Sequence, residues 1–107
     1  ELMNSDHINQ SAWSLARRLI LECGNDKEKM IARAYRLALA RPPRAGERQL
    51  ALTYLDRQTR LLQDQADSGN PPRIEIEVSA PTEPFFAAAL ADFCLVIFNL
   101  DEFLFVD

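Results

Sequence analysis

Side chains that perform chemistry in proteins are few in this chain, and none has the spacing of a catalytic motif. His7 is the only histidine. None of the five serines lies in the Gly-x-Ser-x-Gly turn that exposes a nucleophile. The three glycines (Gly24, Gly46 and Gly69) are too far apart for a phosphate-binding loop or a dinucleotide fingerprint. The sequence therefore predicts no catalytic residue and no cofactor-binding residue in this segment.

The potential metal ligands are equally sparse. Cys23 and Cys94 are the only cysteines, and neither belongs to a Cys-x-x-Cys pair, so no zinc or thioredoxin-like site is predicted. Both fall on apolar helix faces, where a buried free thiol is common. A disulfide in an oxidising compartment is the alternative. His7 lies beside Asp6 and near Glu1 without ligand spacing, so we predict no metal site.

The charge is distributed unevenly along the chain. Residues 1–66 carry 11 basic and 8 acidic side chains, a net charge of +3, whereas residues 67–107 carry 1 basic and 8 acidic side chains, a net charge of −7. We attribute the asymmetry to attraction between two parts that pack together. A nucleic-acid partner is not expected, because the chain as a whole is acidic and lacks a recognisable reader motif. No apolar run is long enough for a transmembrane segment, which needs about 20 residues.

Four helices are predicted to carry these groups. The first is expected to start near Asn4 or Ser5 and to end at Gly24, and the others to cover Asp26–Arg41, Ala45–Ala66 and Pro84–Phe98. Ser5 or Asn4 can cap the first helix and Asp26 the second, and Gly24 suits the left-handed residue that follows many helices. The second helix is expected to stop at Arg41, because a proline disfavours helical geometry in the residue before it.

Apolar spacing indicates how these helices pack. The fourth helix is apolar on nearly all sides, which is typical of a central helix. The third has an apolar stripe at helical spacing, centred on Leu50, Tyr54, Gln58 and Leu61 and flanked by Ala51, Leu55 and Leu62. The sequence therefore predicts an all-α fold, a compact bundle of four main helices with a short C-terminal turn and one long irregular loop. We expect residues 1–107 to form a single helical domain.

The long loop is predicted over residues 67–84. It begins with a cluster of helix-breaking residues, Asp-Ser-Gly-Asn-Pro-Pro. Ile74, Ile76 and Val78 then alternate with acidic or polar residues, as in a half-buried strand, but no second strand is predicted to pair with it. We interpret these three side chains as a candidate docking strand for a partner.

Three blocks of sequence resemble one known family. Residues 2–5 read Leu-Met-Asn-Ser, residues 35–47 read Tyr-Arg-Leu-Ala-Leu-Ala-Arg-Pro-Pro-Arg-Ala-Gly-Glu, and residues 98–107 read Phe-Asn-Leu-Asp-Glu-Phe-Leu-Phe-Val-Asp. Together, and in this order, they resemble the C-terminal portion of the planctomycete-specific PSD-one domain, a family of unknown function. Ala40 stands where the family usually has glycine, and Leu100-Asp101 stands where it has Ser-Asn.

The resemblance implies a context rather than an activity. Members of the family are typically large, exported proteins that often carry cytochrome-c-like domains. It therefore implies that residues 1–107 are the C-terminal part of a larger periplasmic or extracellular protein. Any haem would lie outside this segment, which has no Cys-x-x-Cys-His motif. The family has no established catalytic residue that could be transferred.

These observations favour a non-catalytic structural or protein-interaction module of a larger exported planctomycete-type protein. Its partners would be other domains of the same polypeptide or a separate protein. One alternative is a module that binds a carbohydrate or another ligand. A second is a scaffold within an enzyme whose active site lies elsewhere. The sequence does not indicate an oligomeric state.

The second and third blocks suggest one specific contact. We predict that the end of the chain folds back against the corner between the second and third helices. Phe103 would enter the apolar space near Leu37 and Leu50. Glu102 would accept hydrogen bonds from Arg41 or Arg36, because a guanidinium can bind a carboxylate through two parallel bonds.

Overall fold

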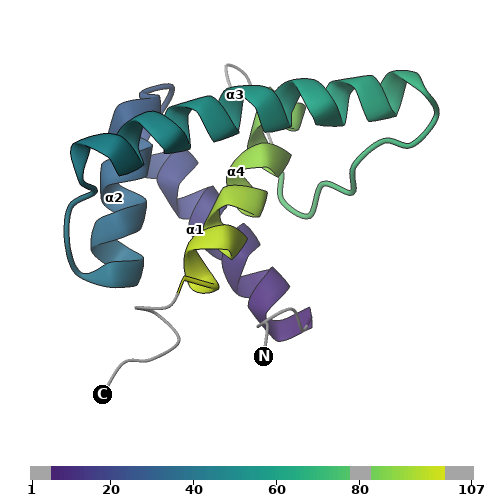
Figure 1. The fold of residues 1–107 in the computed structure, drawn as a ribbon. Helices are drawn as coiled ribbons and strands as arrows, with labels where there is room; N and C mark the ends of the chain where they lie inside the picture. The colour runs from purple at the N-terminus through teal and green to yellow at the C-terminus, as the bar shows by residue number, and fades with distance from the viewer. Residues whose placement is uncertain (1–5, 78–82, 101–107) are drawn as a thin grey trace.

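Four helices make up the fold. The computed structural model describes residues 6–77 and 83–100. The helices are α1 (Asp6–Cys23), α2 (Lys27–Leu39), α3 (Ala45–Asp67) and α4 (Pro84–Phe98), and no strand occurs in these two ranges. The prediction of an all-α bundle is confirmed (Figure 1). Among the described helices, none is both long and apolar enough to cross a membrane.

The helix boundaries follow from local chemistry. Asp26 caps α2, where its Oδ1 accepts a hydrogen bond from the backbone N–H of Lys29 at 3.0 Å. Gly24 closes α1 with a φ of +64°, which glycine adopts without strain. Pro84 occupies the first turn of α4, where its missing N–H leaves no bond unmade.

α2 ends two residues earlier than predicted. Its last residue is Leu39, and Ala40 follows in the left-handed conformation with φ 59° and ψ 29°. The backbone N–H of Ala40 still donates to the carbonyl of Arg36, at 3.1 Å. The chain therefore leaves the helix through Ala40 before it reaches the proline pair, and Arg41 lies in the connection.

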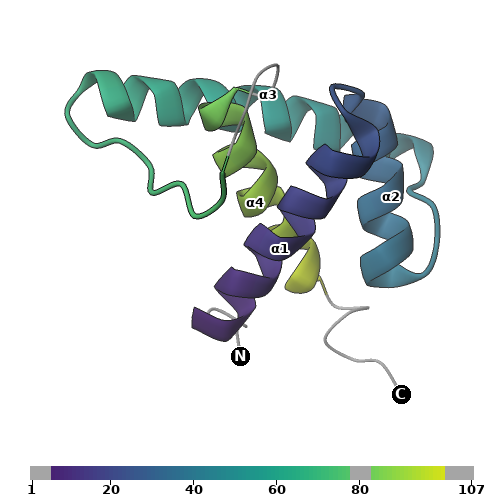
Figure 2. The same ribbon diagram turned by 180° about the vertical axis from the view of Figure 1, so that it is seen from behind.

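α4 is the central helix, as its sequence predicts. It contacts each of the other three helices and lies between α1 and α3, which do not contact each other (Figures 1 and 2). Both α1 and α4 bury alanines: Ala12 and Ala16 on α1, and Ala87, Ala88 and Ala91 on α4. Small side chains let two helix axes approach closely, because the side chains at the contact set the distance between the axes.

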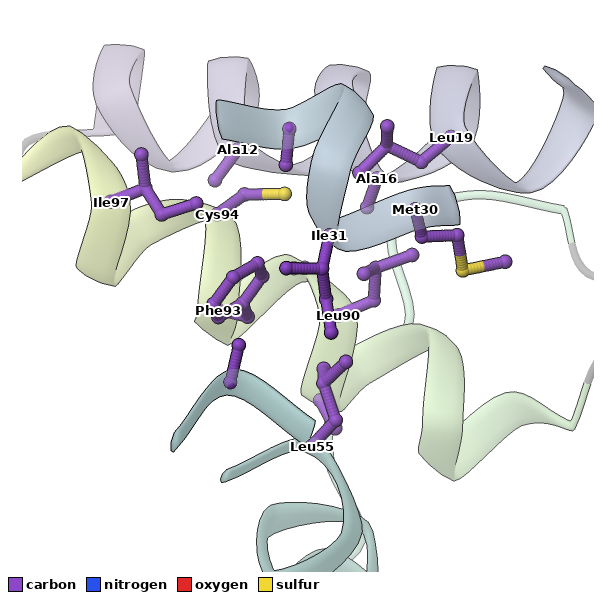
Figure 3. Packing of buried hydrophobic residues seen from close by; sticks show 14 of the residues in the cluster. Ala12, Ala16, Leu19, Met30, Ile31, Leu55, Leu90, Phe93, Cys94 and Ile97 are labelled. Carbon is purple, nitrogen blue, oxygen red and sulfur yellow. The ribbon is translucent and has the colours of Figure 1, made fainter. Parts of the chain in front are cut away.

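The core receives side chains from all four helices (Figure 3). The largest fully buried side chains are Leu19, Met30, Ile31, Leu55, Leu90, Cys94 and Ile97. Trp13, the only tryptophan, is 8% exposed and belongs to the same cluster. Its ring therefore packs in the core, as is usual for an aromatic residue in a small domain.

The buried face of α3 lies on the flank of the predicted apolar stripe, about one position from its centre. The buried residues are Ala51, Leu55 and Leu62, whereas Leu50 is 72% exposed and Leu61 is 48% exposed. The apolar surface of α3 is wider than the strip that α4 covers. The position of the neighbouring helix therefore determines which α3 residues are buried, and the centre of the apolar stripe does not. The C-terminal turns of α3 extend past the bundle, where the sequence is polar (Figure 1).

The two oppositely charged parts of the chain do pack together, but not through ion pairs between described residues. Every ion pair described within 6–77 and 83–100 joins two residues from the same part. Two amide–carboxylate hydrogen bonds cross between the parts: Asn9 Nδ2 donates to Glu75 Oε2 at 3.0 Å, and Gln58 Nε2 donates to Asp92 Oδ2 at 2.9 Å.

Candidate functional site: the groove between α3 and α4

An open groove with a volume of about 780 Å³ lies where α4 crosses α3. α3 lines it with Leu50 and Leu61, and Val96 near the end of α4 and Leu100 just beyond that helix line it on the other side. We call this feature the α3–α4 groove. Its volume lies within the range of about 300–1,000 Å³ that is common for binding pockets.

The walls of the groove expose aliphatic side chains to solvent. Leu50, Leu61 and Val96 are 72%, 48% and 46% exposed. In the part of the chain that the structure describes, the other exposed large hydrophobic residues are Leu21 and Leu37, which do not line the groove. A contiguous apolar patch with polar neighbours is typical of a surface that another polypeptide segment covers.

The floor of the groove is aromatic and tightly packed. The Phe93 ring centroid lies 6.5 Å from that of Tyr35 and 6.2 Å from that of Tyr54, and both pairs are tilted. Tyr35 and Phe93 are only 6% and 4% exposed. The aromatic surface that this floor presents to a ligand therefore belongs mainly to Tyr54, which is half-buried.

Tyr54 of this floor and Asp92, which acts on Tyr54 electrostatically, both have altered acidity. Burial, and secondly the charge of Asp92, raises the pKa of Tyr54 to about 12. Burial also raises the pKa of Asp92 above its usual value, although the hydrogen bond from Gln58 opposes this. A tyrosine that keeps its proton so firmly is a poor general base near neutral pH. Near neutral pH the Tyr54 hydroxyl therefore keeps its proton and can donate a hydrogen bond.

One end of the groove is fixed by the corner between α2 and α3. Arg41 Nη1 donates to Glu47 Oε1 at 2.8 Å, and Arg41 Nη2 donates to Glu47 Oε2 at 3.0 Å. The Arg44 backbone N–H donates to the same Oε1 at 2.9 Å. These bonds lower the pKa of Glu47 to about 2, and the bonding to Arg41 has the largest effect, followed by the bond from the Arg44 backbone. The Arg41 guanidinium also lies over the Tyr35 ring, 5.5 Å from its centroid, so the corner is joined to the groove floor.

Of the residues predicted to join at this corner, Arg41 lies in the connection that follows α2 and not at the end of the helix. Its described carboxylate partner is Glu47, which sequence reasoning missed. Glu102 and Phe103 lie outside the described residues, so their predicted contacts stay predictions. The Arg36 side chain is exposed on α2. Of the two leucines predicted near Phe103, Leu50 lines the α3–α4 groove and Leu37 does not.

The isoleucines of the predicted docking strand face the core of their own domain and not a partner. Residues 74 and 76 alternate with exposed neighbours as predicted, but Ile74 and Ile76 are partly buried against the core of their own domain. Glu75, between them, accepts the hydrogen bond from Asn9 of α1. The isoleucine face is thus already packed, and Val78 lies outside the described residues.

α3 ends at Asp67 and α4 begins at Pro84, so the connection between them matches the predicted loop within one residue.

The cysteines and carboxylates of the described residues form no further site. Cys23 and Cys94 are both free thiols, and complete burial raises the pKa of Cys94. Within residues 6–77 and 83–100, no three His, Cys, Asp or Glu side chains converge in a way that could hold a metal ion.

Comparison with known proteins adds no relative: no family model, curated protein or solved structure matches this chain. A functional interpretation therefore depends on the geometry of the α3–α4 groove and on the resemblance in sequence.

Proposed function

We propose that this domain is a non-catalytic interaction module that binds an apolar polypeptide segment in the α3–α4 groove. The observation that supports this most directly is the exposure of Leu50, Leu61 and Val96 around one groove. Covering aliphatic surface contributes about 25 cal/mol per Å² removed from water, so a segment with apolar side chains gains free energy by binding there.

The chemistry of the groove favours a polypeptide over a carbohydrate. A sugar ring stacks on an exposed aromatic face, but Tyr35 and Phe93 are almost completely buried, and among the described aromatic lining residues Tyr54 alone is partly exposed. The large exposed apolar side chains of the groove are aliphatic. Of its polar lining residues, Glu47 is bound to Arg41 and Gln58 donates to Asp92, whereas Thr53 and Arg57 are exposed. Apolar side chains of a bound segment complement these walls better than hydroxyl groups do.

The resemblance in sequence supplies the proposed setting. In a larger exported planctomycete-type protein, the segment in the groove would belong to the same polypeptide or to a protein that assembles with it. If the larger protein is an enzyme with its active site elsewhere, this domain acts as a scaffold by binding another part of that enzyme in the same groove.

Thiol labelling tests whether the groove is covered. Leu50→Cys and Leu21→Cys place a thiol at two positions of similar exposure, 72% and 67%, on different helices. Both variants carry Cys23→Ala, because Cys23 is partly exposed, whereas the fully buried Cys94 is protected. In the natural polypeptide that contains this domain, we expect the thiol at position 50 to react with a maleimide about tenfold more slowly than the thiol at position 21, because a bound segment must first dissociate. Equal rates would reject the proposed function.

A further inference from the structure

We propose that the segment in the α3–α4 groove is the end of this same chain, Asp101–Asp107, in an extended conformation with Phe103 and Phe105 facing α3. This inference rests on the proposed function of the groove and names its occupant. These seven residues lie outside the described part of the structure, so the argument uses their sequence and the place where they begin.

The segment starts inside the groove. Leu100, the last described residue, lines the α3–α4 groove together with Val96 of α4. A segment of seven residues spans up to about 23–25 Å when extended, at about 3.3–3.6 Å per residue. From Leu50 to Leu61, α3 rises only about 16 Å, at 1.5 Å per residue. The segment is thus long enough to cover the exposed wall, and its attachment at Leu100 keeps it at a high effective concentration.

The side chains of the segment match the groove. Its centre reads Phe-Leu-Phe-Val, four consecutive apolar residues. In an extended chain, successive side chains point to opposite sides, so Phe103 and Phe105 share one face while Leu104 and Val106 share the other. The two phenyl rings are about 7 Å apart in an extended chain, so they can cover the exposed Leu50 and the half-buried Tyr54, one turn further along α3. This burial also removes the rings from water.

The charges are also complementary. The segment contains three carboxylate side chains, Asp101, Glu102 and Asp107, and no basic side chain. Arg57 lines the groove, is exposed, and makes no ion pair or hydrogen bond to another residue of the described ranges. Arg48 is also exposed on α3. Such complementarity contributes more to orientation than to affinity, and it favours this acidic segment over a basic one.

The test uses the 107-residue chain with the Leu50→Cys thiol in three forms of the segment. The first has the natural segment, the second carries Phe103→Ser with Phe105→Ser, and the third carries Leu104→Ser with Val106→Ser as a matched control. We expect the double phenylalanine change to speed maleimide labelling at position 50 about tenfold, because the covering segment dissociates more readily. The control changes should alter the rate less than about twofold, since their side chains face away. Leu21→Cys should label at one rate in all three forms.

Each other outcome contradicts a distinct part of the proposal. Slow labelling at position 50 in all three forms would mean that a second copy or another segment covers the groove, which rejects the inference but not the proposed function. If position 50 is labelled as fast as position 21 in all three forms, the inference is rejected. If position 50 is also labelled as fast as position 21 in the natural polypeptide, the proposed function is rejected as well. Equal acceleration by both double changes would reject the extended orientation.

A second measurement does not depend on the serine variants. With Cys23→Ala, Leu50→Cys and Phe103→Cys should form an intrachain disulfide rapidly under mild oxidation, and Leu21→Cys with Phe103→Cys should not. Similar rates of disulfide formation in the two pairs would overturn the proposal.

Discussion

Arg41 and Glu47 join the end of α2 to the start of α3 through two parallel hydrogen bonds of 2.8 and 3.0 Å. The pair spans Pro42-Pro43, where the chain cannot continue as a helix. Both side chains are mostly shielded from solvent, with 20% and 26% exposed. The bidentate geometry fixes the direction of the turn as well as neutralising the charges.

Replacing this carboxylate should destabilise the domain. We expect Glu47→Gln to lower the free energy of unfolding by about 1–2 kcal/mol, because hydrogen bonds between charged groups are stronger than neutral ones, with a reduction for partial solvent screening. Urea denaturation at pH 7 measures this change. Asp56→Asn is the control, since the Arg60–Asp56 pair is exposed and should contribute about 0.5 kcal/mol or less. Equal effects of the two substitutions would contradict a special role for the corner.

The same substitution should change how stability depends on pH. The pKa of Glu47 is about 2 in the folded chain, below its ordinary value of 4.5. A carboxyl with a lowered pKa in the folded state stabilises it above the ordinary value, and this contribution is lost as pH falls from about 4.5 to 2. The difference in stability between the natural chain and Glu47→Gln should therefore shrink over that window. A difference that stays constant down to pH 2 would contradict the assignment.

Asp92 should show the opposite sign. Burial raises its pKa in the folded chain, so its ionisation costs more in the folded state than in the unfolded state. Its contribution to stability therefore decreases as pH rises above its ordinary value of 3.8. We expect Asp92→Asn, which can still accept the bond from Gln58, to raise the free energy of unfolding at pH 7 by up to about 1 kcal/mol. Urea denaturation at several pH values should show the gain disappear at acidic pH, whereas a loss at pH 7 would contradict the argument.

Ala40→Gly should stabilise the domain. The left-handed conformation costs an L-residue about 1–2 kcal/mol, and the extra freedom of glycine in the unfolded chain offsets about 0.4–1 kcal/mol of that benefit. We expect a net gain of about 0.5–1 kcal/mol, measured by thermal or urea denaturation. Ala32→Gly within α2 is the matched control and should lose about 0.5–1 kcal/mol. A loss at both positions would show that residue 40 does not hold the left-handed conformation in solution.

Phe93→Ala should be among the most damaging single changes. Phe93 is 4% exposed on the central helix and supports both tyrosine rings of the groove floor. Truncating a buried phenylalanine costs about 3–5 kcal/mol. Val96→Ala on the same helix is the control, since Val96 is 46% exposed and its truncation should cost about 1 kcal/mol or less. Urea denaturation of both variants measures the difference, and a loss below about 1 kcal/mol for Phe93→Ala would mean that α4 is not the core helix.

The sequence predicts the helices well because their ends depend on local signals. Asp26 binds the backbone of the helix it begins, Gly24 adopts the left-handed conformation, and Pro84 lies in a first turn, all as their residue types imply. The central place of α4 was predictable for a related reason. A helix with apolar residues on nearly every side can be stable in water only when other helices surround it.

The groove and the Arg41–Glu47 pair at its corner were not predicted, because both depend on how the helices are arranged in space. Leu50 and Leu55 are equally apolar, and only the path of α4 determines that Leu55 is fully buried while Leu50 is exposed. Glu47 left a usable signal, since a glutamate three residues after a helix start often binds the N-cap backbone. Its second partner, Arg41, is six residues away in the sequence, and their contact depends on the turn at Pro42-Pro43.

The burial of Trp13 has an optical consequence. As the only indole in the chain, it should emit at short wavelength while α1 stays packed and at longer wavelength once the core opens to water. α1 contributes no lining residue to the α3–α4 groove, so changes to the groove or to the chain end should leave this emission unaltered when the fold is intact. The protein thus contains its own fluorescent reporter of folding, which requires no dye and is separate from the surface that we propose to be functional.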